Sequence, residues 1–233
     1  MTDDRRTELA ANLEAVRERI VRACEDAGRD PAGVTLIAVT KFFPATDVDL
    51  LAGLGVTDIG ENRDQEASAK LADVAVRADL QVHFIGQLQS KKAGSVVGYA
   101  DVVQSVDRPK LVTALGRAAQ SAGKVVDVLV QVNLDEAPGR GGVPPADARA
   151  LADAVAHSAS LRLRGVMAVA PLGSDPAPAF ARLQEVAGAI REDHPEADWI
   201  SAGMSGDLEA AIAHGATHLR VGSAILGTRE SHR

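Results

Sequence analysis

The chain opens with a helical pattern of apolar positions. Apolar residues recur at steps of three and four over residues 5–27, with charged side chains between them. The spaced residues are Leu9, Leu13, Val16, Ile20 and Ala23/Cys24. Such spacing forms one apolar stripe along a helix, and Gly28 is a natural end for it. The pattern predicts an N-terminal helix, within residues 1–30, that packs on the rest of the fold.

Eight short apolar runs follow, and helical patterns lie between most of them. The first run, 34–39, is continuously apolar and rich in β-branched residues, which is typical of a strand buried on both faces of a parallel sheet. The runs are 34–39, 56–60, 81–85, 101–105, 126–133, 161–169, 197–200 and 217–221. The helical patterns are 46–53, 62–76, 90–98, 108–122, 145–158, 177–193 and 205–214.

Alternation of strands and helices implies a parallel sheet, and eight such units in about 200 residues predict a closed (β/α)8 TIM barrel with an extra N-terminal helix. A doubly wound open sheet is the competing fold, but no glycine-rich dinucleotide-binding turn follows the first strand. The most loop-like stretch, 138–145, falls between a strand and its helix. We therefore predict one domain over 1–233, with this stretch as a long loop on the functional face.

Composition narrows the function classes. Lys and Arg total 25 against 32 Asp and Glu, and only 3% of residues are aromatic, which disfavours a nucleic-acid binder. No apolar run approaches the ~20 residues that span a bilayer, and the N-terminus lacks the apolar core of a signal peptide. A single cysteine, Cys24, can form neither an internal disulfide nor a thiolate metal site. We expect a cytoplasmic protein without a metal.

In a barrel of this kind, chemistry lies at the carboxyl ends of the strands. Lys41 is the most informative residue there, because it comes directly after the apolar run 34–39. An amine at this rim would be partly desolvated, which favours attack on a carbonyl carbon. An ordinary surface lysine just beyond a strand is the alternative that position alone leaves open.

The last two units carry residues suited to an anion. Residues 201–205 and 221–224 each run from a predicted strand into a predicted helix, with Ser205 as a plausible N-cap. Free N–H groups at a helix start, next to glycine, can bind phosphate, and barrels often use these two loops for it. Ordinary helix capping is the alternative, which Asp207 and Glu209 slightly favour.

Seven stretches, spread from residue 36 to residue 227, resemble the single-domain pyridoxal phosphate homeostasis (PLP-binding) protein family. They include Leu36-Ile37-Ala38-Val39-Thr40-Lys41, Gly60-Glu61-Asn62-Arg63-Asp64-Gln65-Glu66 and His83-Phe84-Ile85-Gly86-Gln87-Leu88-Gln89. The others are 130–133, 164–168, 201–212 and 220–227.

That resemblance implies a site for pyridoxal 5'-phosphate. Lys41 would form a Schiff base with the aldehyde of the cofactor, and Arg220 would face its pyridine nitrogen. Asn62 and His83 would line the ring, and Met204 would belong to the same site. The phosphate would be held by Ser201, Ser205, Gly222 and Ser223.

The chain departs from the family pattern at three places. Ala202 stands where Met is usual, and Lys91 stands where Asn commonly precedes Lys92. The stretch 138–145 replaces a shorter loop that contains lysine, and it leaves open how the mouth of the site is gated.

The resemblance implies a monomeric holder of pyridoxal phosphate that passes it to apo forms of enzymes that use this cofactor. A weak amino-acid racemase is the alternative, but it needs a second acid–base group opposite the lysine, often a tyrosine. The one tyrosine, Tyr99, is predicted at the end of a helix, at the wrong end of the barrel. A third possibility is a sugar-phosphate barrel enzyme without a cofactor.

Overall fold

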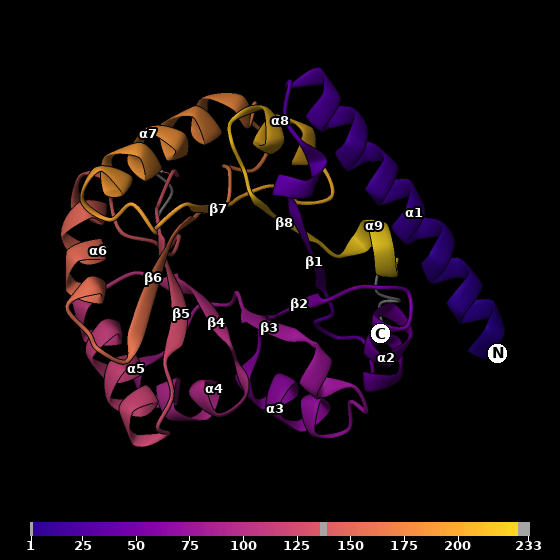
Figure 1. The fold of residues 1–233 in the computed structure, drawn as a ribbon, viewed down its shortest axis with the longest axis horizontal. Coiled ribbons are helices and arrows are strands. Elements are labelled where there is room, and N and C mark those ends of the chain that lie inside the picture. Colours follow the sequence, from indigo (N-terminus) through magenta and orange to yellow (C-terminus); the bar gives the residue numbers. More distant parts are fainter. Residues whose placement is uncertain (1, 136–138, 228–233) are drawn as a thin grey trace.

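Eight parallel strands close into a barrel with helices around it (Figure 1). The computed structural model describes residues 2–135 and 139–227. The strands, which pair in sequence order with β8 returning to β1, are β1 (Thr35–Val39), β2 (Asp58–Glu61), β3 (Gln81–Phe84), β4 (Val102–Val106), β5 (Val126–Gln131), β6 (Leu161–Met167), β7 (Trp199–Ser201) and β8 (His218–Val221). The predicted TIM barrel is confirmed, and the open-sheet alternative is wrong.

The helices alternate with the strands as the pattern predicts. They are α1 (Thr2–Asp26), α2 (Ala45–Ala52), α3 (Asp64–Ala72), α4 (Ala93–Tyr99), α5 (Pro109–Ser121), α6 (Ala148–Ala156), α7 (Ala177–Asp193), α8 (Leu208–Ala213) and α9 (Ser223–Leu226). Short 3-10 turns at Pro31–Gly33, Arg77–Asp79, Ser90–Lys92 and Pro145–Asp147 join them. Two of these turns occupy the starts of the predicted helices 90–98 and 145–158, so α4 and α6 begin later than predicted.

The interior of the barrel is partly polar. Val102, Leu129 and Met167 form a small apolar cluster with Trp199 packed against it, separate from the large core between the strands and the outer helices. Buried polar side chains occupy much of the remaining interior, among them His83, Gln104, Ser201 and Arg220. These groups need hydrogen-bond partners inside the barrel, because an unpaired buried polar group is costly.

The N-terminal helix α1 runs along the outside of the barrel beside α8 and α9 (Figure 1). Its apolar stripe is buried, as the spacing predicts. Asn12 donates to the carbonyl of Ile225 at 2.9 Å, and Arg19 donates to the carbonyl of Ser205 at 3.1 Å. Helix α1 therefore supports the two loops that follow β7 and β8.

The loop after β5 folds back onto its own strand. Val132 and Val143 form an isolated parallel bridge, and the Val143 N–H donates to the carbonyl of Gln131 at 2.8 Å. Pro138, the first residue of the predicted loop, lies outside the described residues. Within 2–135 and 139–227, no helix is long and apolar enough to cross a membrane.

Truncating the stripe of α1 tests how much this helix stabilises the barrel. Leu13 is 1% exposed, and we expect Leu13→Ala to lower the free energy of unfolding by about 2–5 kcal/mol, since it leaves a cavity between α1 and the barrel. Urea unfolding followed by circular dichroism measures this change. Leu172→Ala is the control, because Leu172 is 77% exposed and should shift the value by less than about 0.5 kcal/mol. Equal effects of the two substitutions would contradict the packing of Leu13 between α1 and the barrel.

Candidate functional site

The predicted site residues gather at the carboxyl ends of β1, β2, β7 and β8. Lys41 follows β1 by two residues and is partly exposed, with its Nζ 5.9 Å from the centre of the Phe42 ring. Strand β1 pairs with β8 so that Ile37 lies opposite Arg220 and Ala38 opposite Val221. This register brings the segment that carries Lys41 next to the loop that carries Gly222 and Ser223.

The backbone on both sides of Lys41 is held by charged side chains. Lys70 Nζ donates to the carbonyl of Thr40 at 2.7 Å, and the Phe42 N–H donates to the Glu66 carboxylate. Phe42 has a φ of 71°, in the left-handed region that few residues other than glycine adopt. Such a conformation persists only where the surroundings enforce it, so these two contacts set the direction in which Lys41 leaves the barrel.

Behind Lys41 lies a buried ion pair. Lys70 Nζ is 2.6 Å from Glu61 Oε1, and the Thr40 hydroxyl donates to the same oxygen at 2.5 Å. Glu61 Oε2 has no hydrogen-bond partner within the described part of the chain. Burial raises the pKa of Glu61, and the nearby ammonium of Lys70 offsets this only in part. The pair therefore holds two charges in a place where neither could remain alone.

On the other side of the mouth, the loops after β7 and β8 meet through two serines. The Ser205 hydroxyl accepts from the Ser223 hydroxyl at 3.2 Å and from the Ala224 N–H at 3.3 Å. The expectation that Ser205 caps the helix is wrong: α8 begins at Leu208, Asp207 is at its N-cap, and the Asp207 carboxylate accepts from the Met204 N–H at 2.6 Å. Ser205 is thereby left to bridge the two loops.

Two glycines let these loops approach the barrel closely. Gly203 has a φ of 91°, and a Cβ there would lie 2.7 Å from the Cβ of Ala211. A Cβ at Gly222 would lie 3.3 Å from the Cβ of Val39, on the strand that leads to Lys41. The exposed Ser223 and the half-buried Ser205 are consequently presented beside the end of β1.

Arg220 is the buried cation of the site. It is 4% exposed, and its guanidinium donates to the Ser201 hydroxyl at 2.7 Å and to the carbonyl of Ala168 at 2.8 Å. Burial lowers the pKa of Arg220 to about 10, so the group stays charged at neutral pH. Ser201 is fully buried, and its hydroxyl accepts from Arg220 and donates to Gln104. These bonds favour a position for Ser201 beneath the site over direct contact with a phosphate.

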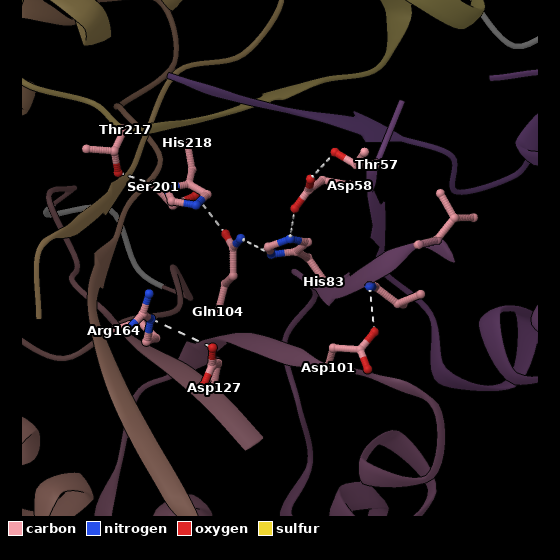
Figure 2. Close-up of polar contacts among 12 residues, drawn as sticks. Thr57, Asp58, His83, Asp101, Gln104, Asp127, Arg164, Ser201, Thr217 and His218 are labelled. Carbon is pink, nitrogen blue, oxygen red and sulfur yellow. Dashed lines mark hydrogen bonds and ion pairs between the residues drawn. The ribbon is translucent and has the colours of Figure 1, made fainter. Parts of the chain in front are cut away.

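His83 also lies deeper than the rim. It is fully buried, with Nε2 2.9 Å from Asp58 Oδ1 and Nδ1 2.9 Å from Gln104 Nε2 (Figure 2). Asn62 is half-buried directly after β2 and lines a pocket of about 470 Å³ with Phe84 and Gln87. Asn62 is therefore at the mouth, while His83 contacts groups within the barrel.

Below His83, aromatic rings form the floor of the barrel interior. The rings of Trp199 and His218 lie 4.2 Å apart, and the Arg164 guanidinium lies 4.4 Å from the centre of the Trp199 ring. Burial lowers the pKa of His218 to about 3, which keeps this side chain neutral. His218 therefore adds no positive charge beside the guanidinium groups of Arg164 and Arg220.

The structure adds several residues whose roles the sequence did not indicate. They are Asp58, Gln104 and the group Thr40, Glu61 and Lys70. Gln104 and Ser105 end the predicted strand 101–105, and this place at a strand end is the sequence signal for Gln104. Lys70 comes from α3 and reaches Thr40 across the fold, so no local pattern could have predicted the contact.

Tyr99 ends α4 just before β4, at the amino end of that strand, as predicted. Its hydroxyl is buried, and burial raises its pKa. The rim residues that face Lys41 come from the carboxyl ends of the strands. The helix end that carries Tyr99 therefore lies at the opposite end of the barrel from the strand ends that lead to Lys41.

A (β/α)8 barrel with a lysine beyond its first strand and serine loops after its last two belongs to the alanine racemase type. Residues 9–230 match the family model described as "Alanine racemase, N-terminal domain". The chain also superposes on the alanine racemase of Streptomyces coelicolor A3(2) with a TM-score of 0.77, at 21% identity over 96% of this chain and 59% of that one. At this identity, the likeness shows the fold alone.

Closer relatives give the family. A Mycobacterium tuberculosis protein named pyridoxal phosphate homeostasis protein is 43% identical over 97% of this chain and 95% of its own. The Escherichia coli K12 protein of the same name is 37% identical over 96% and 97%. PipY of Synechococcus elongatus PCC7942, solved with PLP bound, has a TM-score of 0.83 and 34% identity over 94% of this chain and 100% of that one. The chain belongs to the pyridoxal phosphate homeostasis protein family.

The buried ion pair behind Lys41 can be tested by removing one partner. We expect Lys70→Met to lower the free energy of unfolding by roughly 3–5 kcal/mol, because Glu61 is left as an uncompensated buried carboxylate. The double variant Glu61→Gln/Lys70→Met should recover part of this loss, and urea unfolding measures both. Lys91→Met, at an exposed position, is the control. A loss below about 1 kcal/mol for Lys70→Met would mean that the pair does not hold the backbone at Lys41.

Proposed function

We propose that this chain binds pyridoxal 5'-phosphate, the vitamin B6 cofactor, and takes part in its homeostasis within the cell. The observation that carries the proposal is the pairing of β1 with β8. It brings Lys41, which follows β1, beside the loop after β8 that carries Ser223. The Ser223 hydroxyl contacts that of Ser205, and Arg220 lies within β8. The PLP-bound structure of PipY and the name of the curated relatives support it.

The chemistry of these residues fits that cofactor. Pyridoxal phosphate carries an aldehyde, a phosphate and a pyridine nitrogen, and the bound group supplies an electrophilic carbon conjugated to an electron-withdrawing ring. Lys41 offers the amine for the aldehyde, and Ser205, Gly222 and Ser223 offer hydroxyl and N–H donors for the phosphate. Arg220 is a buried donor, and no carboxylate of residues 2–135 or 139–227 is in direct hydrogen-bond contact with it. An anionic ligand would compensate its charge.

Each residue of the proposed site, at the rim or beneath it, then has one role. Lys41 holds the cofactor through an imine bond, formed with loss of water and reversible by exchange with another amine. Arg220 only donates, so it favours an unprotonated pyridine nitrogen and a weaker electron sink. Asn62 and Met204 border the ring, and His83 acts on the site from below. Ser201 acts with Arg220 beneath the phosphate loops.

A reversible bond suits a holder of a reactive aldehyde. We propose that the protein is a cytoplasmic monomer that keeps pyridoxal phosphate masked and passes it to apo enzymes. Cys24 is buried, and with no other cysteine it can form no internal disulfide, which is compatible with a reducing compartment. Mixing the loaded protein with a named apo enzyme, and following the recovery of that enzyme's activity, tests the transfer.

A weak amino-acid racemase is the alternative function, and the shared alanine-racemase fold is what favours it. It would need a second acid–base group on the face of the cofactor opposite Lys41. Incubating the loaded protein with L-alanine in D2O separates the two functions. No deuterium at the α-carbon supports a holder. Sustained deuteration would contradict it, and the appearance of D-alanine would identify a racemase.

Lys41→Ala tests the covalent attachment. We expect loss of the absorbance near about 420 nm that is typical of such an imine, with an unchanged circular dichroism spectrum, since Lys41 lies outside the core. Lys91→Ala, which removes an exposed amine, should keep the band. If a borohydride-reducible adduct remained in Lys41→Ala at parental yield, another amine would hold the cofactor.

Ser223→Ala tests the phosphate loops. We expect roughly tenfold weaker retention of the cofactor, because a hydrogen bond to a charged phosphate is lost, while the absorbance band at saturation stays. Equilibrium dialysis against increasing pyridoxal phosphate measures the Kd. Ser68→Ala, on the exposed face of α3, is the control. Equal affinities of Ser223→Ala and the parent would remove Ser223 from the site.

A further inference from the structure

A continuous row of hydrogen bonds crosses the barrel interior from Arg220 to Asp58. The Arg220 guanidinium is 2.7 Å from the Ser201 hydroxyl, which is 2.7 Å from Gln104 Oε1. The other end of the Gln104 amide is 2.9 Å from His83 Nδ1, and His83 Nε2 is 2.9 Å from Asp58 Oδ1. Figure 2 shows the part of this row from Ser201 through Gln104 and His83 to Asp58.

The two ends of the row fix the direction of every bond in it. A guanidinium can only donate, and an ionised carboxylate can only accept. Burial acts to raise the pKa of Asp58, but hydrogen bonds from His83 and Thr57 outweigh it and leave that pKa below its ordinary value. Asp58 is therefore a carboxylate, so His83 donates from Nε2 and accepts at Nδ1. Gln104 then donates to His83 and accepts from Ser201, which itself accepts from Arg220.

This direction gives each of the four hydrogen bonds of the row one donor and one acceptor. Reversing the Gln104 amide would require a proton on His83 Nδ1 and would deprive the Ser201 hydroxyl of its acceptor. The residues of the row come from β2, β3, β4, β7 and β8, and His83, Gln104 and Ser201 are fully buried. Hydrogen bonds therefore link residues of five strands, and the Arg220 guanidinium lies at one end of the row.

We propose that Asp58, His83, Gln104 and Ser201 act as positioning residues that fix the orientation and the charge of Arg220. Ser201 and the carbonyl of Ala168 take two of the five N–H groups of the guanidinium, and the other three have no hydrogen-bond partner among the described residues. The negative end of the row, at Asp58, complements the cation that Arg220 brings into the interior. The part of this inference that concerns the pyridine nitrogen rests on the proposed function.

Gln104 is the residue to change, because it lies in the middle of the row and away from the mouth. We expect Gln104→Leu to raise the Kd for pyridoxal phosphate about tenfold, which corresponds to about 1.4 kcal/mol. In an Arg220→Ala background, the same change should alter the Kd less than about twofold, because Gln104 acts through Arg220. Ser105→Ala is the matched control: it is the neighbouring residue on β4, equally buried, and its hydroxyl has no partner among the described residues.

Equal tenfold losses in the parent and in the Arg220→Ala background would overturn the proposal, since they would make Gln104 merely structural. A Gln104→Leu variant that binds as tightly as the parent would overturn it as well. Gln104→Glu is the second variant, and it keeps an acceptor for Ser201. We expect it to bind closer to the parent than Gln104→Leu does.

A second measurement uses the apo protein. It therefore tests the row of hydrogen bonds independently of whether the protein binds pyridoxal phosphate. In the apo protein labelled with 15N-histidine, long-range proton–nitrogen spectra report which ring nitrogen of His83 is protonated, with His83→Gln used for assignment. We expect a proton on Nε2 alone, whether or not pyridoxal phosphate binds. A proton on Nδ1, alone or together with Nε2, would overturn the row as drawn.

Discussion

The return of β8 to β1 is the contact on which the site depends. In an open sheet, the first and last strands would lie at opposite edges, and Lys41 would be far from Arg220 and Ser223. Closure pairs Ile37 with Arg220 and brings Gly222 against Val39. Because parallel strands also end on the same side, the amine of Lys41 and the hydroxyls of the loops after β7 and β8 lie at the same end of the barrel. The helix α1 then supports α8 and α9, which carry or adjoin the serine loops.

The barrel interior contains buried polar side chains, and each of them needs a hydrogen-bond partner there. Arg220 enters it as a cation, and its guanidinium bonds a hydroxyl and a carbonyl rather than a carboxylate. Burial alone would make such a charge strongly unfavourable. Three features reduce this cost of burying the Arg220 charge. They are the row of hydrogen bonds that ends at the Asp58 carboxylate, the neutral state of His218 and the opening of the barrel. Stability and site geometry are therefore determined by the same hydrogen bonds.

A second polar group holds the other half of the site. Lys70 and Glu66 bond the backbone on either side of Lys41, and Phe42 keeps a conformation that these contacts enforce. The lysine and the arginine are thus each supported by buried or half-buried residues that lie behind the rim. This arrangement fixes the backbone at Lys41 and the guanidinium of Arg220 independently of each other.

The sequence by itself determined the barrel and its outer helix, because periodicities of two kinds, strand runs and helical stripes, record which faces are buried. It also identified Lys41, Ser205, Ser223 and Arg220 as candidates, since strand ends form the functional face of such a barrel and the resemblance singled out these positions. Only the tertiary structure showed that Ser201 and His83 lie beneath the rim and that Asp207, not Ser205, occupies the N-cap position of α8. It alone revealed the contacts of Gln104, Asp58 and Lys70. Hydrogen bonds between distant strands depend on register and side-chain direction, and neither leaves a local pattern in the chain.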